Sequence, residues 1–468
     1  MRSILALALL TLAACWNGES ALHMACKTDA HCGRGQSCIN DFCGGPPEGS
    51  SGPTSASTSA STSASTESTE TGDACEPPMP LLCDPTRRVV EPALSATPLA
   101  GLDLDQPVAV LAGDFVGSAR PDILVQSNYH VTLLENAAGN FQIRDTDSHD
   151  AQGVNMVAAD LDGNGVSEFL LLDQLGVDVL TWNDGFSEFQ ERLPLPLSAD
   201  ERVFSHAVAD VDGDGLPDLI VSGAAAIYFV PNVGGMLEPT QMTSLAGQFD
   251  KPWDTLVVTA GEERRILVTA SGEAAPGTSN HVVHVLSVNA GQLEEGEPFG
   301  EEFQHPWALA QGDFLGGEEM EIVVAERWLV APTGGETEPT AVPGRLRFYT
   351  FIDGQASEIG PALEIGVGPK VLESADLDCD GKTDLVIGTS GRVGMDNGEP
   401  QVLFGSCAEQ ADPQDLVTLA FASGISAGSR IAVADFDDDG LIEVAIPDFG
   451  DPPEEGQRII LLDVQEAP

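Results

Sequence analysis

The sequence predicts an all-β fold over residues 89–468, a seven-bladed β-propeller of four-stranded antiparallel blades. Three observations predict it. An acidic nonapeptide recurs along this part of the chain, short apolar runs lie on both sides of each copy, and the copies start roughly every 50 to 60 residues. Repeats of this length are typical of radial arrays of small antiparallel sheets.

The most complete nonapeptide is DVDGDGLPD at residues 210–218, with carboxylates at positions 1, 3, 5 and 9 and glycine at position 6. This spacing can wrap a backbone around one hard cation, because Ca²⁺ takes about six to eight oxygen ligands. Glycine at position 6 permits the tight turn. Nearly complete copies begin at Asp160, Asp376 and Asp435. The sequence therefore predicts four calcium-binding loops.

The residues around these loops exclude an EF-hand. An EF-hand requires glutamate at position 12 and a helix on each side. Position 12 is instead apolar, at Leu171, Val221, Ile387 and Ile446. The runs before and after each loop are short, apolar and β-branched, which is typical of buried strands. Each loop is therefore expected to join two strands.

Three weaker units complete the repeat. The units at Asp114 and Asp313 keep positions 1 and 9 but lose other carboxylates, and a shorter turn near Thr259 replaces the loop in a third. We expect no metal in these three. The seven units then start at residues 114, 160, 210, 259, 313, 376 and 435. The last unit has only three strands, so the spare segment 93–99 is predicted to complete its blade and close the ring.

This pattern resembles the FG-GAP/VCBS repeat family, the calcium-loop propellers that include the heads of integrin α chains and many secreted bacterial proteins. The resemblance covers nearly all of residues 89–468 and is strong in four units. In that family, loop residues 1, 3, 5 and 9 and the carbonyl of residue 7 bind Ca²⁺. The implied ligand sets are Asp160, Asp162, Asn164, Val166 and Glu168; Asp210, Asp212, Asp214, Leu216 and Asp218; Asp376, Asp378, Asp380, Lys382 and Asp384; and Asp435, Asp437, Asp439, Leu441 and Glu443.

The N-terminal region is typical of an exported, anchored protein. Residues 1–14 have one cation and then an apolar run, as in a secretory signal peptide. Residues 12–15, LAAC, resemble the lipobox of bacterial lipoproteins, which implies lipidation of Cys15 and attachment to the outer membrane or cell surface. Several acyl chains on one cysteine give stable anchoring.

Three short segments separate this anchor from the propeller. Residues 15–44 form a small cysteine-rich module that resembles those of myxobacterial surface proteins. Its cysteines 26, 32, 38 and 43 are expected to form two disulfides, in any of the three possible connectivities, with a zinc site as the alternative. Residues 45–74, rich in Ser, Thr, Pro and Gly, are predicted to be a disordered tether. Residues 75–88 contain Cys75 and Cys83 and are expected to form a small loop.

The charge and the loops indicate a binding role. A formal net charge of −54 argues against nucleic acid as a partner. The connections between second and third strands are long in the last four units, on the face opposite the calcium loops, and long loops often carry recognition. Trp253 and Trp307 lie beside this half. They are expected either to form an aromatic platform for a glycan or peptide or to pack between neighbouring blades.

The sequence thus predicts a lipid-anchored, calcium-binding surface propeller that binds an extracellular protein or glycan. No catalytic constellation was found, so no enzymatic activity is expected. The alternatives are a secreted enzyme acting on polysaccharide, of the lyase or dehydratase type, and a plain structural surface protein. An enzyme should bring several charged residues together at the ring centre near Trp307. A binding module should instead present an aromatic or hydrophobic patch without a perturbed acid–base pair.

Overall fold

The computed structural model describes residues 38–39, 42–43 and most of 93–465. Within the last range, the longer stretches outside the description are 148–154, 196–202, 272–280, 331–339, 390–399, 412–415, 419–429 and 449–457. The predicted signal peptide, Cys15, the tether and the loop of Cys75 and Cys83 all lie outside the described residues. The cysteine-rich module is represented by one antiparallel pair, β1 (Cys38–Ile39) and β2 (Phe42–Cys43), in which Cys38 lies opposite Cys43.

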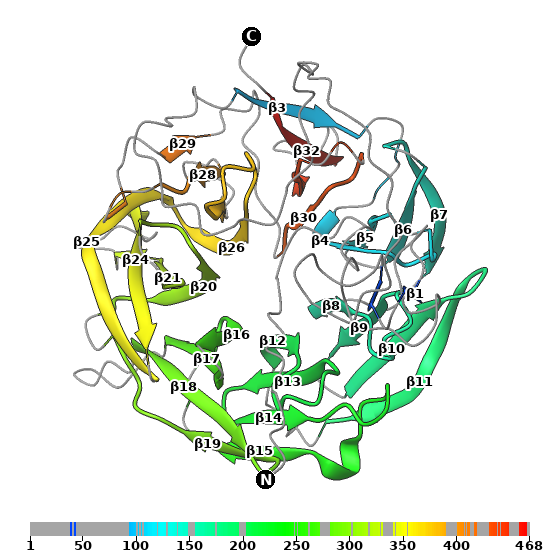
Figure 1. Ribbon diagram of the computed structural model, residues 1–468, viewed down its shortest axis with the longest axis horizontal. Helices are drawn as coiled ribbons and strands as arrows, with labels where there is room; N and C mark the ends of the chain where they lie inside the picture. Colours follow the sequence, from blue (N-terminus) through cyan, green and yellow to red (C-terminus); the bar gives the residue numbers. More distant parts are fainter. Residues whose placement is uncertain are drawn as a thin grey trace, which may run out of the picture.

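The described residues form seven four-stranded antiparallel sheets arranged in a ring (Figure 1). The innermost strands surround the axis: β4 (Pro107–Gly113), β8 (Asn155–Ala159), β12 (Val203–Ala209), β16 (Thr255–Ala260), β20 (Pro306–Gly312), β26 (Pro369–Ala375) and β30 (Ala432–Ala434). Each ends at or next to one of the seven predicted loop starts. The predicted seven-bladed propeller is therefore confirmed. Blades are numbered 1 to 7 in the order of these strands.

The second strand of each blade follows its loop directly: β5 (Asp122–Ser127), β9 (Glu168–Leu172), β13 (Asp218–Gly223), β17 (Glu263–Ser271), β21 (Glu321–Glu326), β27 (Asp384–Thr389) and β31 (Glu443–Asp448). Every residue of β5, β13, β21 and β27 is buried. Neighbouring sheets cover both faces of these strands, which is why their sequences are continuously apolar and not alternating.

The outer strands complete the blades: β6 (Val131–Asn136), β7 (Phe141–Asp147), β10 (Gly176–Trp182), β11 (Phe186–Pro194), β14 (Ala226–Val230), β15 (Thr243–Ala246), β18 (His281–Asn289), β19 (Gln292–Glu295), β24 (Pro343–Ile352), β25 (Gln355–Val367), β28 (Gln401–Leu403) and β29 (Leu416–Thr418). A small additional hairpin, β22 (Leu329–Val330) and β23 (Thr340–Ala341), lies between β21 and β24. The helical element among the described residues is one short 3-10 turn, η2 (Pro239–Gln241). No helix in that part of the chain is long and apolar enough to cross a membrane.

The ring closes through both ends of the propeller sequence. Strand β3 (Ala93–Pro98) pairs antiparallel with β32 (Arg458–Gln465), giving the last blade the order β3-β32-β31-β30. The first and last blades also meet at the axis, where Ala109 of β4 forms a parallel bridge with Arg430. The predicted closing role of segment 93–99 is confirmed. Closure packs the faces of the first and last blades against each other, and an open array would leave both exposed.

The core is divided among the blade interfaces. Seven apolar clusters are present among the described residues, and each joins two neighbouring blades. Between blades 1 and 2, for example, the rings of Phe115 and Phe169 meet edge to face with centroids 6.1 Å apart. Stability therefore depends on how each blade is held against the next, and much of that contact lies around the loops between first and second strands.

Candidate functional site

The four complete loops lie on one end of the ring, called here the acidic face. Each brings carboxylate oxygens within 4.8 Å of one another. The clusters are Asp160, Asp162 and Glu168; Asp210, Asp212 and Asp218; Asp376, Asp378 and Asp384; and Asp435, Asp437, Asp439 and Glu443. A set of crowded carboxylates suits a hard cation such as Ca²⁺. The four clusters could therefore hold metal ions.

The loops are organised by hydrogen bonds from their own backbone. In the loop of blade 3, the N–H of Gly215 donates to Asp210 Oδ2 (3.0 Å), that of Asp214 to Asp212 Oδ1 (3.1 Å) and that of Leu216 to Asp214 Oδ1 (2.9 Å). The loops of blades 2 and 6 repeat this pattern. Asp and Asn favour such local bonds to nearby backbone groups. The acidic residues thus shape the turn as well as crowding their charges.

Two loop positions require the left-handed backbone region. Position 6 has φ between 87° and 93° at Gly165, Gly215 and Gly381. Position 4 also has positive φ, and in blade 6 it is occupied by Cys379, with φ 53°. The turn at position 6 was predicted from the sequence, and the positive φ at position 4 was not. Cys379 is disulfide-bonded, which ties the residue in this uncommon conformation to another part of the chain.

The carboxylate at position 9 has a structural role in addition to the predicted one. It is the first residue of the second strand, and it accepts the N–H of position 2: Leu161 to Glu168 (2.9 Å), Val211 to Asp218 (3.0 Å), Leu377 to Asp384 (2.8 Å) and Phe436 to Glu443 (2.6 Å). The incomplete loops keep this bond, from Phe115 to Asp122 and from Phe314 to Glu321. Position 9 therefore survives where the other carboxylates are lost, because it closes the turn.

Burial raises the pKa values of these carboxyl groups. It raises the pKa of Glu168 to about 7, that of Asp218 to about 6 and that of Glu443 to about 8, against the smaller lowering effect of their backbone hydrogen bonds. Neighbouring loop carboxylates raise these pKa values further. A divalent cation would reverse this balance by favouring the charged forms. The donor set therefore fits Ca²⁺.

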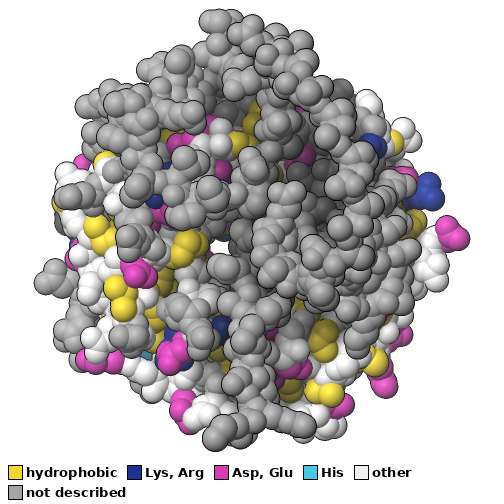
Figure 2. All heavy atoms as spheres, in the orientation of Figure 1, with side chains coloured by type: hydrophobic (Ala, Val, Ile, Leu, Met, Phe, Trp, Pro, Cys, Tyr) yellow, Lys and Arg dark blue, Asp and Glu magenta, His cyan; other side chains and the backbone are white. Residues whose placement is uncertain are grey.

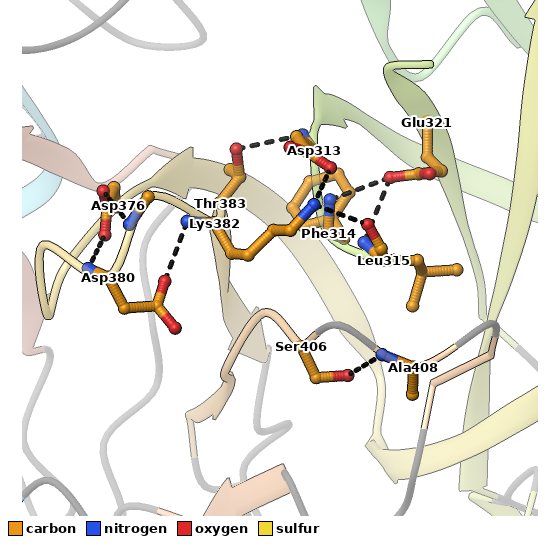
Figure 3. Close-up of polar contacts among 11 residues, drawn as sticks. Asp313, Phe314, Leu315, Glu321, Asp376, Asp380, Lys382, Thr383, Ser406 and Ala408 are labelled. Atoms are coloured by element: carbon orange, nitrogen blue, oxygen red, sulfur yellow. Dashed lines mark hydrogen bonds and ion pairs between the residues drawn. The ribbon is translucent and has the colours of Figure 1, made fainter. Parts of the chain in front are cut away.

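Position 7 was predicted to offer a carbonyl in each loop, at Val166, Leu216, Lys382 and Leu441, and this stays a prediction. The side chain of Lys382 has an unpredicted role. Its ammonium reaches the incomplete loop of blade 5, where Nζ lies 2.6 Å from Asp313 Oδ1 and 2.9 Å from the carbonyl oxygen of Leu315 (Figure 3). A second cation, Arg264 of blade 4, approaches the loop of blade 3, with Nη2 3.1 Å from Asp210 Oδ2.

An asparagine at the end of a third strand joins neighbouring loops. In blade 3, Nδ2 of Asn232 donates to the carbonyl of Leu161 in blade 2 (2.8 Å) and to that of Pro217 in its own loop (3.1 Å). Its Oδ1 accepts the N–H of Gly235 (3.0 Å). Asn136 makes the equivalent bonds from blade 1 to blade 7. The sequence analysis missed both residues, although each precedes a glycine by three positions.

The opposite end of the ring, called here the entry face, is where the inner strands begin. Trp253 and Trp307 lie there on adjacent blades and stack with ring centroids 3.9 Å apart and planes at 17°. Phe204 meets Trp253 edge to face. The guanidinium of Arg327 lies 4.7 Å from the centroid of Trp307. Both indoles keep part of their surface accessible. The packing between blades is thus confirmed, and the aromatic platform for a glycan or peptide stays a prediction.

Charged side chains from four blades meet at the axis. Arg430 of blade 7 extends across the ring to His206 of blade 3, with Nη2 3.0 Å from Nε2. Burial raises the pKa of Asp254 and that of Glu373, the latter to about 7, and the positive charge of Arg430 offsets part of this rise. Asp254 accepts N–H groups of Leu309 and Thr255. Arg430, Asp254 and Glu373 all retain accessible surface.

His206 is the fully enclosed member of this axial cluster. Its Nε2 lies 3.0 Å from the carbonyl oxygen of Met156 as well as 3.0 Å from Arg430. Burial lowers its pKa well below the usual value, so the ring is neutral. A neutral Nε2 either donates to the carbonyl or accepts from the guanidinium, but not both. This cluster was not predicted from the sequence; the signal was polar or charged residues within or just before otherwise apolar inner strands.

Comparison with known proteins supports the repeat assignment. Residues 160–221 match a family model described as FG-GAP-like repeat. No curated protein matches the chain. Similar solved structures include the Vanderwaltozyma polyspora Nup133 β-propeller domain, at 9% identity and TM-score 0.47, covering 80% of this chain and 98% of that one.

Two further solved structures show the same level of likeness. A chain from the complex of BBS1N with ARL6DN has 11% identity and TM-score 0.46, over 80% of this chain and 97% of that one. A chain from the S. cerevisiae complex of Dbp5 with Nup159, Gle1, IP6 and ADP has 12% identity and TM-score 0.48, over 80% and 96%. Likeness at this level carries no argument about function. The resemblance drawn from the acidic loops is confirmed by the family model and the fold: the chain is a seven-bladed β-propeller that carries an FG-GAP-like repeat.

Proposed function

We propose that this protein is a calcium-stabilised binding module at the cell surface, held at the outer membrane by lipidated Cys15, that attaches to an extracellular protein or glycan. An FG-GAP-type propeller is a fold of binding and scaffold modules and is typically non-catalytic. The observation that carries the proposal is the set of four acidic clusters of one design on one face of the ring. Extracellular modules bind Ca²⁺ with dissociation constants of about 0.1–1 mM.

Calcium has a structural role in this proposal. Each ion neutralises carboxylates that burial has made difficult to ionise, and it fixes the turn through which one blade contacts the next. At a free calcium concentration about 100 times the dissociation constant, each site would add about 2.7 kcal/mol to the free energy of unfolding. Four such contributions are comparable with the whole stability of a typical domain, about 5–15 kcal/mol.

The first test is thermal unfolding of the full chain with Cys15→Ser, which removes the lipid attachment, in calcium and in excess chelator. We expect chelation to lower the melting temperature by at least about 10 °C. The variant Asp212→Asn should lose part of the calcium effect, whereas Asp184→Asn, in an exposed hairpin turn, should not. An unchanged melting temperature in chelator would rule out a structural calcium role.

The second test concerns the partner. The same protein is applied to arrays of glycans and of extracellular proteins, with calcium and with chelator. A binding module should retain a defined subset of the array in calcium and release it when the ring is destabilised. A plain structural protein should retain none.

The axial cluster favours one second candidate, an enzyme that acts on polysaccharide. Glu373, with its pKa raised to about 7 by burial, lies in the field of Arg430 and Asp254, so a group suited to proton transfer lies near a positive charge. The test compares polysaccharide cleavage by the protein with Glu373 intact and by the Glu373→Gln variant. Cleavage that Glu373→Gln abolishes without changing the melting temperature would establish the enzyme.

A further inference from the structure

The entry face contains a lysine that lacks an acidic partner. The chain has 74 Asp and Glu residues against 20 Lys and Arg. Most described cations pair with a carboxylate, as Arg347 does with Glu326 and Glu358. Lys370 of β26 is half-buried, and among the described residues no carboxylate pairs with it. Burial lowers the pKa of Lys370, and the positive charge of Arg327 lowers it further. Two partly buried cations thus repel one another in a strongly acidic protein.

The backbone brings the segments that carry these two cations close together. Lys370 follows Pro369, and Arg327 follows Glu326 at the end of β21. Gly344 lies between the two segments: a Cβ on it would come within 2.5 Å of Pro369 Cδ and 3.0 Å of the carbonyl oxygen of Glu326. Glycine is therefore required there for blades 5 and 6 to approach so closely. The fold therefore keeps the two segments that carry these cations adjacent.

Aromatic rings border this pair of cations. Arg327 lies over Trp307, which stacks on Trp253. Trp307 and Lys370 are each the second residue of their strands, β20 and β26, so they occupy equivalent positions in adjacent blades. Both strands lie beside the axis (Figure 1). His281 and His305 meet edge to face nearby, and Arg327 donates its N–H to the carbonyl of His305 (2.9 Å). The site therefore combines two cations with partly accessible aromatic surface.

We propose that Lys370 and Arg327 bind the carboxylate of a uronic acid unit in an acidic glycan, with its sugar ring against the edge of the Trp253–Trp307 stack. This deepens the binding role proposed above and rests on it. One carboxylate between the two cations replaces a repulsion with two charge-assisted hydrogen bonds. Sugar rings present C–H groups that pack on aromatic side chains, and ligand sites commonly combine aromatic surface with a few fixed polar groups.

The charge distribution favours a sugar acid over an acidic polypeptide. Figure 2 shows described Asp and Glu side chains around the rim of one end of the ring, with Lys and Arg side chains among them. A densely charged peptide would be repelled by the rest of this protein, whose net charge is −54. A uronic acid unit carries its carboxylate on a ring that can pack on the tryptophans, which the side chain of an acidic peptide does not offer.

The test is titration calorimetry of the full-length Cys15→Ser protein in saturating calcium, with trigalacturonate, galactotriose and triglutamate as probes. We expect trigalacturonate to bind at least about tenfold more tightly than the other two. Lys370→Gln should weaken it about tenfold or more, because a hydrogen bond to a charged group is lost, and Lys370→Arg should preserve most of the affinity. Arg345→Gln removes a cation from an outer strand of blade 5 and should change the affinity less than about twofold.

Three results would overturn the assignment: no binding of trigalacturonate, equal affinity for triglutamate, or equal effects of Lys370→Gln and Arg345→Gln. Each result is interpretable separately from the proposed function. If arrays reveal a calcium-dependent partner that Lys370→Gln still binds, the binding role stands and the uronate site is wrong. If the arrays retain nothing and chelation has no effect, the proposed function itself fails.

Discussion

The ammonium of Lys382 lies 2.6 Å from Oδ1 of Asp313, although the two residues belong to different blades (Figure 3). Asp313 is position 1 of a loop that has leucine at position 3, where the complete loops have aspartate. The lysine thus places a positive charge where a complete loop would use a metal ion. It comes from position 7 of the next loop, whose acidic cluster is intact. The loop of blade 6 therefore supplies, through the side chain of Lys382, a positive charge to the incomplete loop of blade 5.

Replacing Lys382 by glutamine should destabilise the ring. The change leaves Asp313 and the buried Glu321 without a nearby cation. We expect a loss of about 1–2 kcal/mol in the free energy of unfolding, less than for a fully buried pair because Asp313 is partly exposed. Urea denaturation in saturating calcium measures it. Arg345→Gln, which removes an exposed pair with Glu364, is the control, and equal losses in both variants would refute the cation-replacement role.

Arg264 should weaken calcium binding by the loop of blade 3. Its Nη2 lies 3.1 Å from Asp210 Oδ2, so an incoming Ca²⁺ meets a positive charge at position 1. Arg264→Gln is expected to tighten that site about three- to tenfold, since removing a like charge a few ångströms away is worth about 1 kcal/mol where water screens the pair. Calcium titration calorimetry detects the change. This gain in calcium affinity should vanish in the Asp212→Asn background. Arg265→Gln removes the neighbouring arginine, which pairs with Glu263, and should not increase the affinity.

The acidic loops and the blade count could be predicted because both are local patterns. Alternating oxygen ligands, a glycine and an apolar strand all lie within about a dozen consecutive residues, and their repetition sets the number of blades. The cations at Asp313 and Asp210 could not be predicted in this way. Lys382 and Arg264 reach them from the following blade, and the contact depends on how far one loop overlaps the next.

The axial cluster could not be predicted from the sequence, for a related reason. His206 and Arg430 are separated by 224 positions. They meet because ring closure brings the start of one inner strand opposite that of another. An inner strand reads as an apolar segment with an occasional charge, and its pattern does not tell which side chains face the axis. Only the curvature of the ring decides that Arg430 spans it to reach His206.

Asn232 should be a main determinant of the contact between blades 2 and 3. Its side chain bonds with Leu161, Pro217 and Gly235, all at partly or fully buried positions. Asn232→Ala leaves these groups unpaired, and we expect a cost of about 2–3 kcal/mol, measured by urea denaturation. Asn289→Ala, which removes one exposed bond to Glu294, is the matched control and should cost less than about 0.5 kcal/mol. Similar costs for both variants would show that the interloop bonds contribute little.

The stability of the ring should also fall as pH rises through the range in which two buried carboxyls ionise. Burial raises the pKa of Asp122 from 3.8 to about 6 and that of Glu321 from 4.5 to about 7. Between about pH 4 and 7 the folded chain therefore holds protons that the unfolded chain releases. The stability that these groups contribute is fully present below the unfolded pKa values and is lost as pH rises through the folded ones. Each group can contribute a slope of up to about 1.4 kcal/mol per pH unit.

The double variant Asp122→Asn, Glu321→Gln isolates this effect. Neutral side chains can still accept the N–H groups of Phe115 and Phe314, but they do not titrate. In saturating calcium the four complete loops contribute equally to both proteins, so they cancel in the difference between variant and wild type. From pH 5 to pH 7.5 the wild type should lose stability relative to the double variant, as measured by urea denaturation across the series. Parallel pH profiles would mean that these carboxyls are ionised throughout, with their backbone hydrogen bonds outweighing burial.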